Sequence, residues 1–387
     1  MPILPRVGST LAGMEQPQTR FAADVYRDRL DRAARAAAAA GLDGMVIGTG
    51  PDLDYLIGSR AESFERLTAL VIRADGAATV VLPRLERAAL RASATESLGL
   101  EVREWVDGED PYALVAADLG GQRFAVDAAM PALHVLALID RIGRVPSPAT
   151  EVLAGLRMVK DAAEIAALRR AGEAIDRVHA RMGEWLLPGR TEAEVHADIT
   201  AAILAEGHTA AAFVIVGSGP NGADPHHEVS DRKLRAGDTV VIDIGGPVDV
   251  GYNSDCTRTY HLGEPDPELA RRYAVLEAAQ QAAVDHARPG VTAESVDAAA
   301  REVLANAGLA EAFVHRTGHG IGLSVHEEPY IVAGNDFVLG EGMAFSIEPG
   351  VYFPGEWGAR IEDIVVLTAN GCERLNNRPR ALGVLPA

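Results

Sequence analysis

Cysteine is scarce in this chain, which has only Cys256 and Cys372 in 387 residues. Their separation matches no metal-binding spacing, and two isolated thiols provide no disulfide framework. A thiolate zinc site and a cross-linked secreted scaffold are therefore not expected. Two free thiols are compatible with a reducing cytoplasm.

Basic charge is also limited, with 36 Lys and Arg against 55 Asp and Glu and a net charge of −19. This balance opposes attraction to phosphate backbones and anionic lipid, so neither nucleic acid nor a membrane is an expected partner. No apolar run approaches a membrane span, and residues 1–10 lack the apolar segment of a signal peptide. We therefore expect a cytoplasmic protein.

The length favours two domains, and the 48% hydrophobic content supports a large core. Residues 26–40 predict a helix ended by Gly41, followed by a buried strand over 44–47 and a hairpin of strands 70–72 and 79–82. This α/β alternation continues to about residue 145, and Pro146 and Pro148 mark the expected linker. The predicted domains are residues 1–150, which contain no catalytic constellation, and residues 151–387.

The second domain begins with a capping-box pattern at Asp161 and Glu164, which predicts a long helix running to about Trp185. An internal repeat follows. The segment Pro-Gly-Arg-Thr191 recurs as Pro-Gly-Val-Thr292, and Gly207 and Gly308 follow these threonines at equal intervals. Each threonine could cap an Ala-rich helix. Two copies of one unit suggest a pseudo-symmetric domain with a cleft between its halves, although common helix-start signals could also coincide.

Two apolar strands in this domain each contain one acid and are followed by a return strand with another. Asp243 lies in strand 239–244, and the chain turns through 245–247 and returns to Asp255. Glu348 ends strand 343–348, and the return strand 359–366 contains Glu362 opposite it. Burying an ionised acid among Val and Ile costs several kcal/mol unless it has a partner. One such acid alone could equally be structural, but two hairpins with two acids each indicate a site.

Residues 315–326 lie between these hairpins and contain three histidines and three glycines. A lone histidine here would more often be structural, but beside four acids we expect His319 to be a ligand. Four adjacent carboxylates repel one another, and two divalent cations would balance them. Such ligands suit Mn²⁺, with Co²⁺, Fe²⁺ or Zn²⁺ as alternatives. A metal pair about 3.5–4 Å apart can activate a water for attack on a carbonyl.

At these residues the sequence resembles the pita-bread metallopeptidases, which include prolidase, aminopeptidase P and methionine aminopeptidase, with creatinase as a metal-free relative. The motif comprises Ile-Asp243-Ile-Gly-Gly, Ser-Asp255-Cys-Thr-Arg-Thr, Gly-His319-Gly-Ile-Gly, Ile-Glu348-Pro-Gly and Arg-Ile-Glu362-Asp. The resemblance covers nearly the whole chain and is strongest to bacterial Xaa-Pro dipeptidases. It implies an α/β (α+β) protein, with a small creatinase-like N-terminal domain and a C-terminal pita-bread catalytic domain.

The resemblance also implies roles for the five motif residues. Asp255 and Glu362 would bridge two metal ions, Asp243 would hold one of them, and His319 and Glu348 would hold the other. Glu348 would also act as the general base.

Three further residues are expected near the substrate, each with a structural role as the alternative. His226 matches the histidine that steadies the oxyanion, although adjacent His227 leaves that register open. His326 matches the histidine that contacts substrate near the scissile bond. Arg360 could hydrogen-bond the acid cluster or grip the product carboxylate.

The expected function is hydrolysis of Xaa-Pro dipeptides, and the alternative is an aminopeptidase P acting on longer peptides. Methionine aminopeptidase is disfavoured because that branch usually lacks the N-terminal domain, and creatinase because all five ligand positions are filled. An inactive pita-bread protein that binds a partner is less favoured for the same reason. The resemblance further implies a homodimer, in which residues 1–150 help to limit substrate length.

Overall fold

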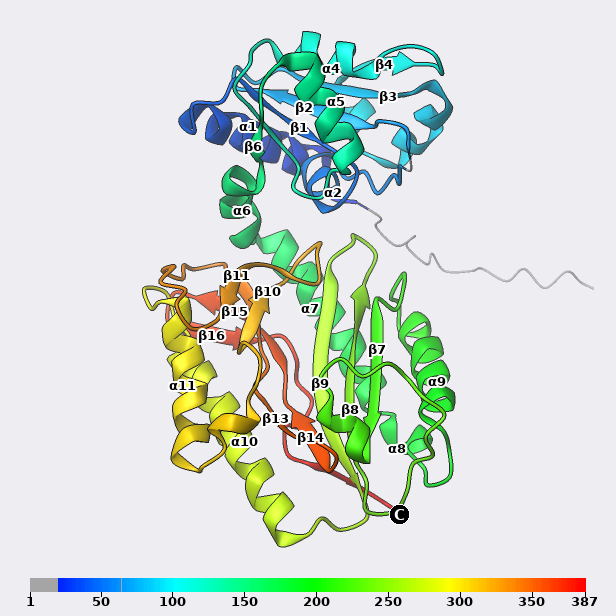
Figure 1. The fold of residues 1–387 in the computed structure, drawn as a ribbon, viewed down its shortest axis with the longest axis vertical. Helices are drawn as coiled ribbons and strands as arrows, with labels where there is room; N and C mark the ends of the chain where they lie inside the picture. The colour runs from blue at the N-terminus through cyan, green and yellow to red at the C-terminus, as the bar shows by residue number, and fades with distance from the viewer. Residues whose placement is uncertain (1–19, 64) are drawn as a thin grey trace, which may run out of the picture.

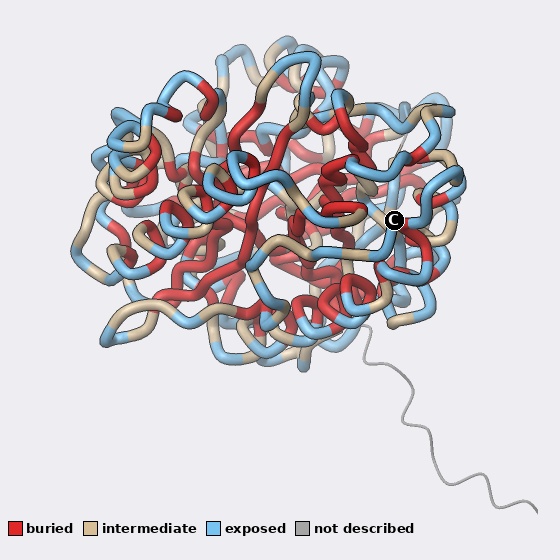
Figure 2. The backbone as a smooth tube through the Cα atoms, turned by 90° about the horizontal axis from the view of Figure 1, so that it is seen from below, coloured by how far each residue is buried: buried red, intermediate tan, exposed pale blue. Residues whose placement is uncertain are grey.

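The computed structural model describes residues 20–63 and 65–387, so residues 1–10 lie outside the described part of the chain. A smaller α/β unit lies above a larger one, and helices α6 (Thr150–Met158) and α7 (Ala162–His179) connect them (Figure 1). Viewed from below, the buried segments lie in the interior and exposed turns lie around them (Figure 2). None of the described helices is both long and apolar enough to cross a membrane.

The N-terminal unit is a six-stranded sheet with helices packed on its two faces. The strand order is β4 (Glu101–Trp105), β3 (Ala78–Pro83), β2 (Ala69–Arg73), β1 (Gly44–Ile47), β5 (Phe124–Val126) and β6 (Ser147–Pro148). The helices are α1 (Ala23–Ala39), α2 (Pro51–Ile57), α3 (Thr95–Leu98), α4 (Pro111–Leu119) and α5 (Ala132–Ile142), with the 3₁₀ segment η1 (Arg84–Ala92). Separate apolar clusters cover the two faces, which explains why β1 is apolar throughout.

The predicted helix, first strand and hairpin of this unit are confirmed, including the left-handed Gly41 after α1 at φ 72°. The predicted linker is partly wrong, because Pro148 belongs to β6, which pairs with β5. An edge strand tolerates proline because its outer side needs no N–H donor. The capping box at Asp161 and Glu164 is present, but α7 ends at His179 and a separate helix α8 (Met182–Trp185) follows.

The C-terminal unit contains two sheets and a two-stranded ribbon, flanked by helices. The first sheet has the order β17 (Gly383–Leu385), β9 (Asn253–Leu262), β8 (Thr239–Pro247) and β7 (Phe213–Ser218). The second has β11 (Glu327–Ile331), β10 (Gly318–Gly320), β12 (Ala344–Ile347), β15 (Asp363–Thr368) and β16 (Gly371–Arg374), and the ribbon is β13 (Gly350–Phe353) with β14 (Trp357–Arg360). Helices α7 and α9 (Glu192–Ala205) pack on the first sheet, and α10 (Pro267–His286) and α11 (Ala293–Asn306) flank the second (Figure 1). The short 3₁₀ segments are η2 (Gly219–Ala223) and η3 (Ala310–Ala312).

The two copies of the sequence repeat share one backbone pairing pattern. Thr191 at the start of α9 forms a bridge with Lys233, and Thr292 at the start of α11 forms the same bridge with Val338. The preceding glycines behave alike: Gly189 N–H donates to Leu234 O at 2.8 Å, and Gly290 N–H donates to Leu339 O at 2.9 Å. The repeat therefore reflects two structurally equivalent units.

The helix caps of the two units differ. The Thr191 hydroxyl accepts from Glu194 N at 3.1 Å, so this threonine caps its helix as predicted, and the Glu194 side chain completes a capping box. Thr292 occupies the corresponding N-cap position without a side-chain cap, so the expected capping role of its hydroxyl is wrong. The helix start is instead tied by Ser295 Oγ, which donates to Thr292 O at 2.6 Å.

A buried ion network centred on Arg157 joins the two units. Arg157 on α6 donates to Asp52 of α2 at 2.7 Å, to Ser324 Oγ at 2.9 Å and to Glu327 at the start of β11. Lys160 is 5% exposed and donates to the other oxygen of Glu327. These contacts bind the N-terminal unit and the connecting helix to the strand that follows His326.

Arg29 forms a second connection from α1. Its guanidinium is 3.5 Å from Glu164 of α7 and donates to Tyr55 O at 3.0 Å. Tyr252, in the turn between β8 and β9, donates to the same Glu164 at 2.6 Å. Burial of these charges without partners would cost several kcal/mol, so the contacts favour one arrangement of the two units.

Candidate metal centre

The first pair of acids lies on the β8–β9 hairpin. The strands are antiparallel, and Asp243 pairs with Thr257 while Asp255 pairs with Gly245. The two acids are thus diagonal neighbours on one face of the hairpin. Both side chains line one cavity, as the predicted hairpin requires.

The second pair is carried by two short ladders in place of the single predicted hairpin. Strands β12 and β15 pair up to Ile347 and Asp363, and β13 and β14 pair from Gly350 and Arg360. Glu348 and Glu362 lie in the interval between the ladders, so their backbone N–H groups bond elsewhere, and Glu348 N–H donates to Thr317 O at 2.8 Å. Glu362 N–H donates to Thr257 O at 3.1 Å, and this bond draws the second pair of acids onto the first hairpin.

His319 on β10 presents one imidazole nitrogen to the acids. Its Nδ1 lies 3.0 Å from Gly320 O, which can only accept, so Nδ1 carries the proton. Its Nε2 lies 3.1 Å from Glu348 Oε1 and 3.7 Å from Asp255 Oδ2. A backbone carbonyl that fixes the tautomer in this way is common behind metal-binding histidines.

The buried acids repel one another, and this repulsion adds to the effect of burial on their pKa values. Burial, followed by repulsion from Asp243, raises the pKa of Asp255 well above its usual value. Burial, followed by repulsion from Asp255 and Glu348, does the same to the pKa of Glu362. Among the described residues, Asp243 Oδ1 and Glu362 Oε1 are buried without a hydrogen-bond partner.

These acids and His319 fit divalent cations. One ligand atom each of Asp255, His319 and Glu362 lies within 4.8 Å of the others. Oxygen and imidazole donors suit first-row divalent metals, and positive charge would relieve both the repulsion and the unpartnered oxygens.

Glu348 differs from the other acids because its neighbours favour the ionised form. Burial works to raise its pKa, but the hydrogen bond and charge of His319 outweigh burial and lower it. Ser346 Oγ also donates to Glu348 Oε1 at 2.9 Å. Glu348 is therefore held as a carboxylate at the cavity wall.

The adjacent histidines His226 and His227 face different surroundings. His227 Nε2 contacts the buried carboxylate of Glu192 at 2.8 Å, and Glu192 also accepts from Ser218 and Ser230. His226 lines the cavity with the four acids, whereas His227 does not. This geometry favours His226, and not His227, as the match to the oxyanion-steadying histidine, which the sequence left open.

His326 lies against His319, with ring centroids 4.1 Å apart and planes at 74°. Burial, followed by the positive charges of His319 and Arg316, lowers the pKa of His326 to about 4. The ring is therefore neutral at neutral pH. It borders the cavity but contributes no atom to the compact group of Asp255, His319 and Glu362.

Arg360 is buried and hydrogen-bonded on every side. It donates to Asp243, to Tyr352 Oη at 2.7 Å and to Thr257 Oγ1 at 3.1 Å, and its terminal nitrogens face Pro225 O. Of the two predicted roles, the structure contains the hydrogen bond to the acid cluster.

His315 in the cavity wall and its partner Tyr352 behind it were not predicted. His315 lies 2.9 Å from Tyr352 Oη through Nε2, and that tyrosine also contacts Arg360. His315 lies in the same His- and Gly-rich segment as His319, and its position there was the only feature of the sequence that could have indicated it. A tyrosine in a strand is too ordinary to have indicated Tyr352.

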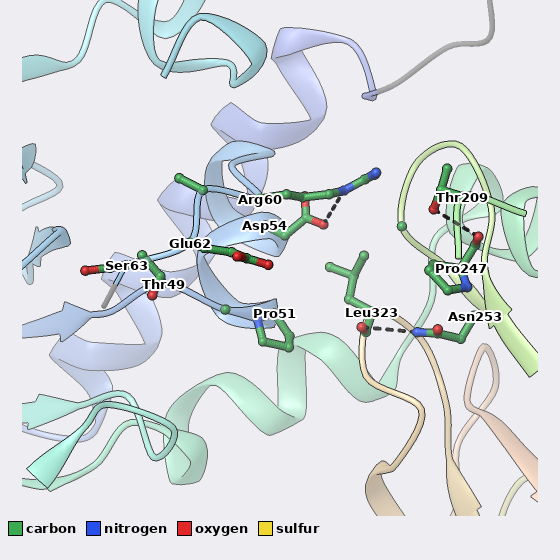
Figure 3. Close-up of a pocket in the computed structure, with 13 residues that line it drawn as sticks. Thr49, Pro51, Asp54, Arg60, Glu62, Ser63, Thr209, Pro247, Asn253 and Leu323 are labelled. Carbon is green, nitrogen blue, oxygen red and sulfur yellow. Dashed lines mark hydrogen bonds and ion pairs between the residues drawn. The ribbon is translucent and has the colours of Figure 1, made fainter. Parts of the chain in front are cut away.

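The acids line a cavity of about 870 Å³, which is large enough for a short peptide. Apolar side chains from β7 and from the segment before and after β10 form part of its wall: Phe213, Ile215, Val314 and Val325. A second cavity of about 470 Å³ lies between the N-terminal unit and the β8–β9 turn (Figure 3). Its wall includes the Arg60–Asp54 pair and none of the four acids.

Comparison with known proteins identifies the family. The model of metallopeptidase family M24 matches residues 166–369, and that of the creatinase/prolidase N-terminal domain matches residues 29–159. The chain belongs to metallopeptidase family M24. It is therefore an enzyme of the metallopeptidase class, and the predicted family and α/β fold are confirmed.

Several members of this M24 family are similar over nearly their whole length. A probable dipeptidase PepE of Mycobacterium tuberculosis is 66% identical over 369 residues, covering 95% of this chain and 98% of that protein. An Xaa-Pro dipeptidase of Lactobacillus delbrueckii subsp. lactis is 36% identical over 356 residues, covering 89% and 96%. The crystal structure of dipeptidase PepE from Mycobacterium ulcerans has a TM-score of 0.92 at 65% identity, covering 95% of this chain and all of that one.

Proposed function

We propose that the protein is a dinuclear-metal Xaa-Pro dipeptidase. The observation that carries this proposal is the convergence of four buried acids and His319 on one peptide-sized cavity. The names of the similar dipeptidases and Xaa-Pro dipeptidases support the substrate class. The proposed catalytic unit is residues 151–387, and residues 1–150 form the N-terminal domain.

Two metal ions would be held by Asp243, Asp255, His319, Glu348 and Glu362. We propose Mn²⁺, and the same donors accept Co²⁺, Fe²⁺ or Zn²⁺. When bound, such ions lower the pKa of an attacking water and polarise the scissile carbonyl. Asp255 and Glu362 would bridge the two ions.

The surrounding residues would then handle protons and charge. Glu348, held as a carboxylate, takes the proton of the attacking water and delivers it to the leaving proline nitrogen. His226 donates a hydrogen bond to the developing oxyanion. His326 contacts the substrate beside the scissile bond, and Arg360 holds Asp243 in place.

We also propose a homodimer in which the N-terminal domain closes the far end of the cleft. A cleft closed in this way admits a dipeptide and excludes longer peptides. An open cleft would instead suit an aminopeptidase P.

The test is hydrolysis of Ala-Pro, Ala-Pro-Ala and Met-Ala-Ser by metal-stripped protein, with and without added Mn²⁺. We expect metal-dependent cleavage of Ala-Pro only. Cleavage of Ala-Pro-Ala would assign the protein to aminopeptidase P, and release of Met would assign a methionine aminopeptidase. No cleavage with two metals bound would refute the substrate class but not the metal site.

A further inference from the structure

The cavity contains one guanidinium group that the catalytic arrangement does not use. Arg316 and Arg360 both line it. Arg360 is 3% exposed, and its five N–H groups donate to Asp243, Tyr352, Thr257 and, twice, to Pro225 O, so it has no donor to spare. Arg316 is half-buried and forms no hydrogen bond or ion pair through its side chain with any residue that the structure describes.

The Arg316 guanidinium is nevertheless held in place. Its central carbon lies 4.5 Å from the centroid of the Tyr330 ring on β11. Stacking on an aromatic face orients the guanidinium plane while its edge N–H groups remain available. Tyr330 is itself tied to the neighbouring loop, because Asn335 Nδ2 donates to Tyr330 O at 2.6 Å.

Charge balance identifies the group that this edge can bind. Two divalent cations would balance the four acids, and Arg360 is already paired with Asp243. A positive charge therefore remains at Arg316, beside His326 and the apolar residues Val314 and Val325 that line the same cavity. A dipeptide ends in a carboxylate, which is the planar partner that guanidinium binds through two parallel hydrogen bonds.

We propose that Arg316 binds the C-terminal carboxylate of a dipeptide substrate and thereby makes the enzyme prefer dipeptides to longer chains. The inference rests on the proposed dipeptidase function and adds a substrate-binding residue to it. A longer peptide presents an amide at this position, which carries no charge for Arg316 to recognise.

The decisive experiment compares Ala-Pro with its C-terminal amide, Ala-Pro-NH₂, in the wild type, Arg316→Met and Arg316→Lys. For Arg316→Met we expect kcat/KM on Ala-Pro to fall about 10- to 100-fold, the usual cost of a lost charge-assisted hydrogen bond. Activity on the amide should stay close to that of the wild type. On Ala-Pro, Arg316→Lys should have a kcat/KM between those of the wild type and Arg316→Met, because it keeps the charge but loses the planar fork. Arg35→Met, at an exposed position on α1, is the matched control and should leave kcat/KM on both substrates unchanged.

A binding measurement gives a readout apart from turnover. In calorimetry, proline should bind the metal-loaded wild type more tightly than prolinamide, and Arg316→Met should remove that preference. Equal losses on acid and amide, or no loss on either, would overturn the role of Arg316. If the wild type cut no Xaa-Pro peptide, the proposed function would fail. The role of Arg316 would then be decided on whichever dipeptide the enzyme does cut, by comparing that dipeptide with its C-terminal amide in the wild type and Arg316→Met.

Discussion

At the scale of single residues, folding and metal binding make opposite demands on Asp255. The residue is 3% exposed and faces three other acids, so without a cation its negative charge opposes the folded state. With divalent cations present the same charge becomes a ligand. The residue is thus a cost to the metal-free protein and a requirement for the metal-bound one.

Asp255→Asn should separate these two effects. In chelator at neutral pH we expect the free energy of unfolding to rise by about 1–3 kcal/mol, because a buried repulsive charge is removed. Metal content and dipeptidase activity should both collapse. Urea unfolding with and without chelator, together with metal analysis, measures both effects, and Asp31→Asn on the surface of α1 is the control. A destabilised metal-free variant would contradict the electrostatic account.

The acids could be predicted because each interrupts an apolar strand, which is unusual enough to be a signal. The residues that hold these acids in place could not be predicted from the sequence. Thr257, Ser346 and Tyr352 are ordinary strand residues, and their contacts with Glu362, His319 and His315 connect segments far apart in the sequence. The choice between His226 and His227 likewise depended on Glu192, whose position beside His227 no local pattern reveals.

At the scale of elements, the connection between α6 and β11 depends on Arg157. Its partners Asp52 and Glu327 have side chains that are only 10% and 9% exposed, and they come from different halves of the molecule. Removing the arginine leaves Asp52 without a counter-ion and leaves Glu327 paired with Lys160 alone, and that loss is much larger than the loss of a surface ion pair.

We therefore expect Arg157→Met to lower the free energy of unfolding by about 3–5 kcal/mol. The matched control is Arg169→Met, which breaks an ion pair with Glu373 whose side chains are 40% and 45% exposed and should cost no more than about 1 kcal/mol. Urea unfolding of both variants measures the difference. Similar values for the two would show that the buried network is not coupled to stability.

The contact of α7 with β9 predicts a loss of stability in acid. His179 is buried between Tyr260 Oη at 3.0 Å and Cys256 O at 3.1 Å, and burial lowers its pKa to about 3. The unfolded chain binds this proton near the ordinary histidine value whereas the folded chain does not. Above the ordinary histidine pKa neither state binds the proton, so His179 leaves the free energy of unfolding unchanged. As the pH falls from there towards 3, the proton bound only by the unfolded chain lowers the free energy of unfolding progressively.

His179→Gln should remove this dependence. Between about pH 7.5 and about pH 5, metal-free wild type should lose about 2 kcal/mol more unfolding free energy than the variant. Urea titrations of both proteins across that range provide the measurement. Parallel curves would mean that His179 takes up a proton in the folded state.

Element positions were predictable where the signal is local and not where it depends on distant partners. The hairpin around Gly76 and the capping box of α7 follow from neighbouring residues. Strand β6 exists because it pairs with β5, and the interruption between β14 and β15 lies where Glu362 N–H bonds to Thr257 O of the other sheet. Long-range pairing of this kind leaves no pattern in a single sequence.

At the scale of the whole molecule, the proposed dimer predicts a link between assembly and substrate length. Sedimentation velocity should give a dimer. Dilution or interface mutations that produce monomers should increase cleavage of Ala-Pro-Ala relative to Ala-Pro, because the far end of the cleft opens. A monodisperse monomer with full and exclusive dipeptidase activity would rule out this role for the N-terminal domain.

The composition of the basic residues has a practical consequence for chemical modification. Lys160 and Lys233 are the only lysines in the sequence, so arginine supplies the rest of the basic charge. The amine of Lys160 is buried against Glu327, whereas Lys233 is exposed. Apart from the terminal amine, an acylating reagent therefore meets one reactive side chain on the folded enzyme. A dye or a surface linker can be attached at Lys233 in the native sequence, and acylation of Lys160 would report unfolding.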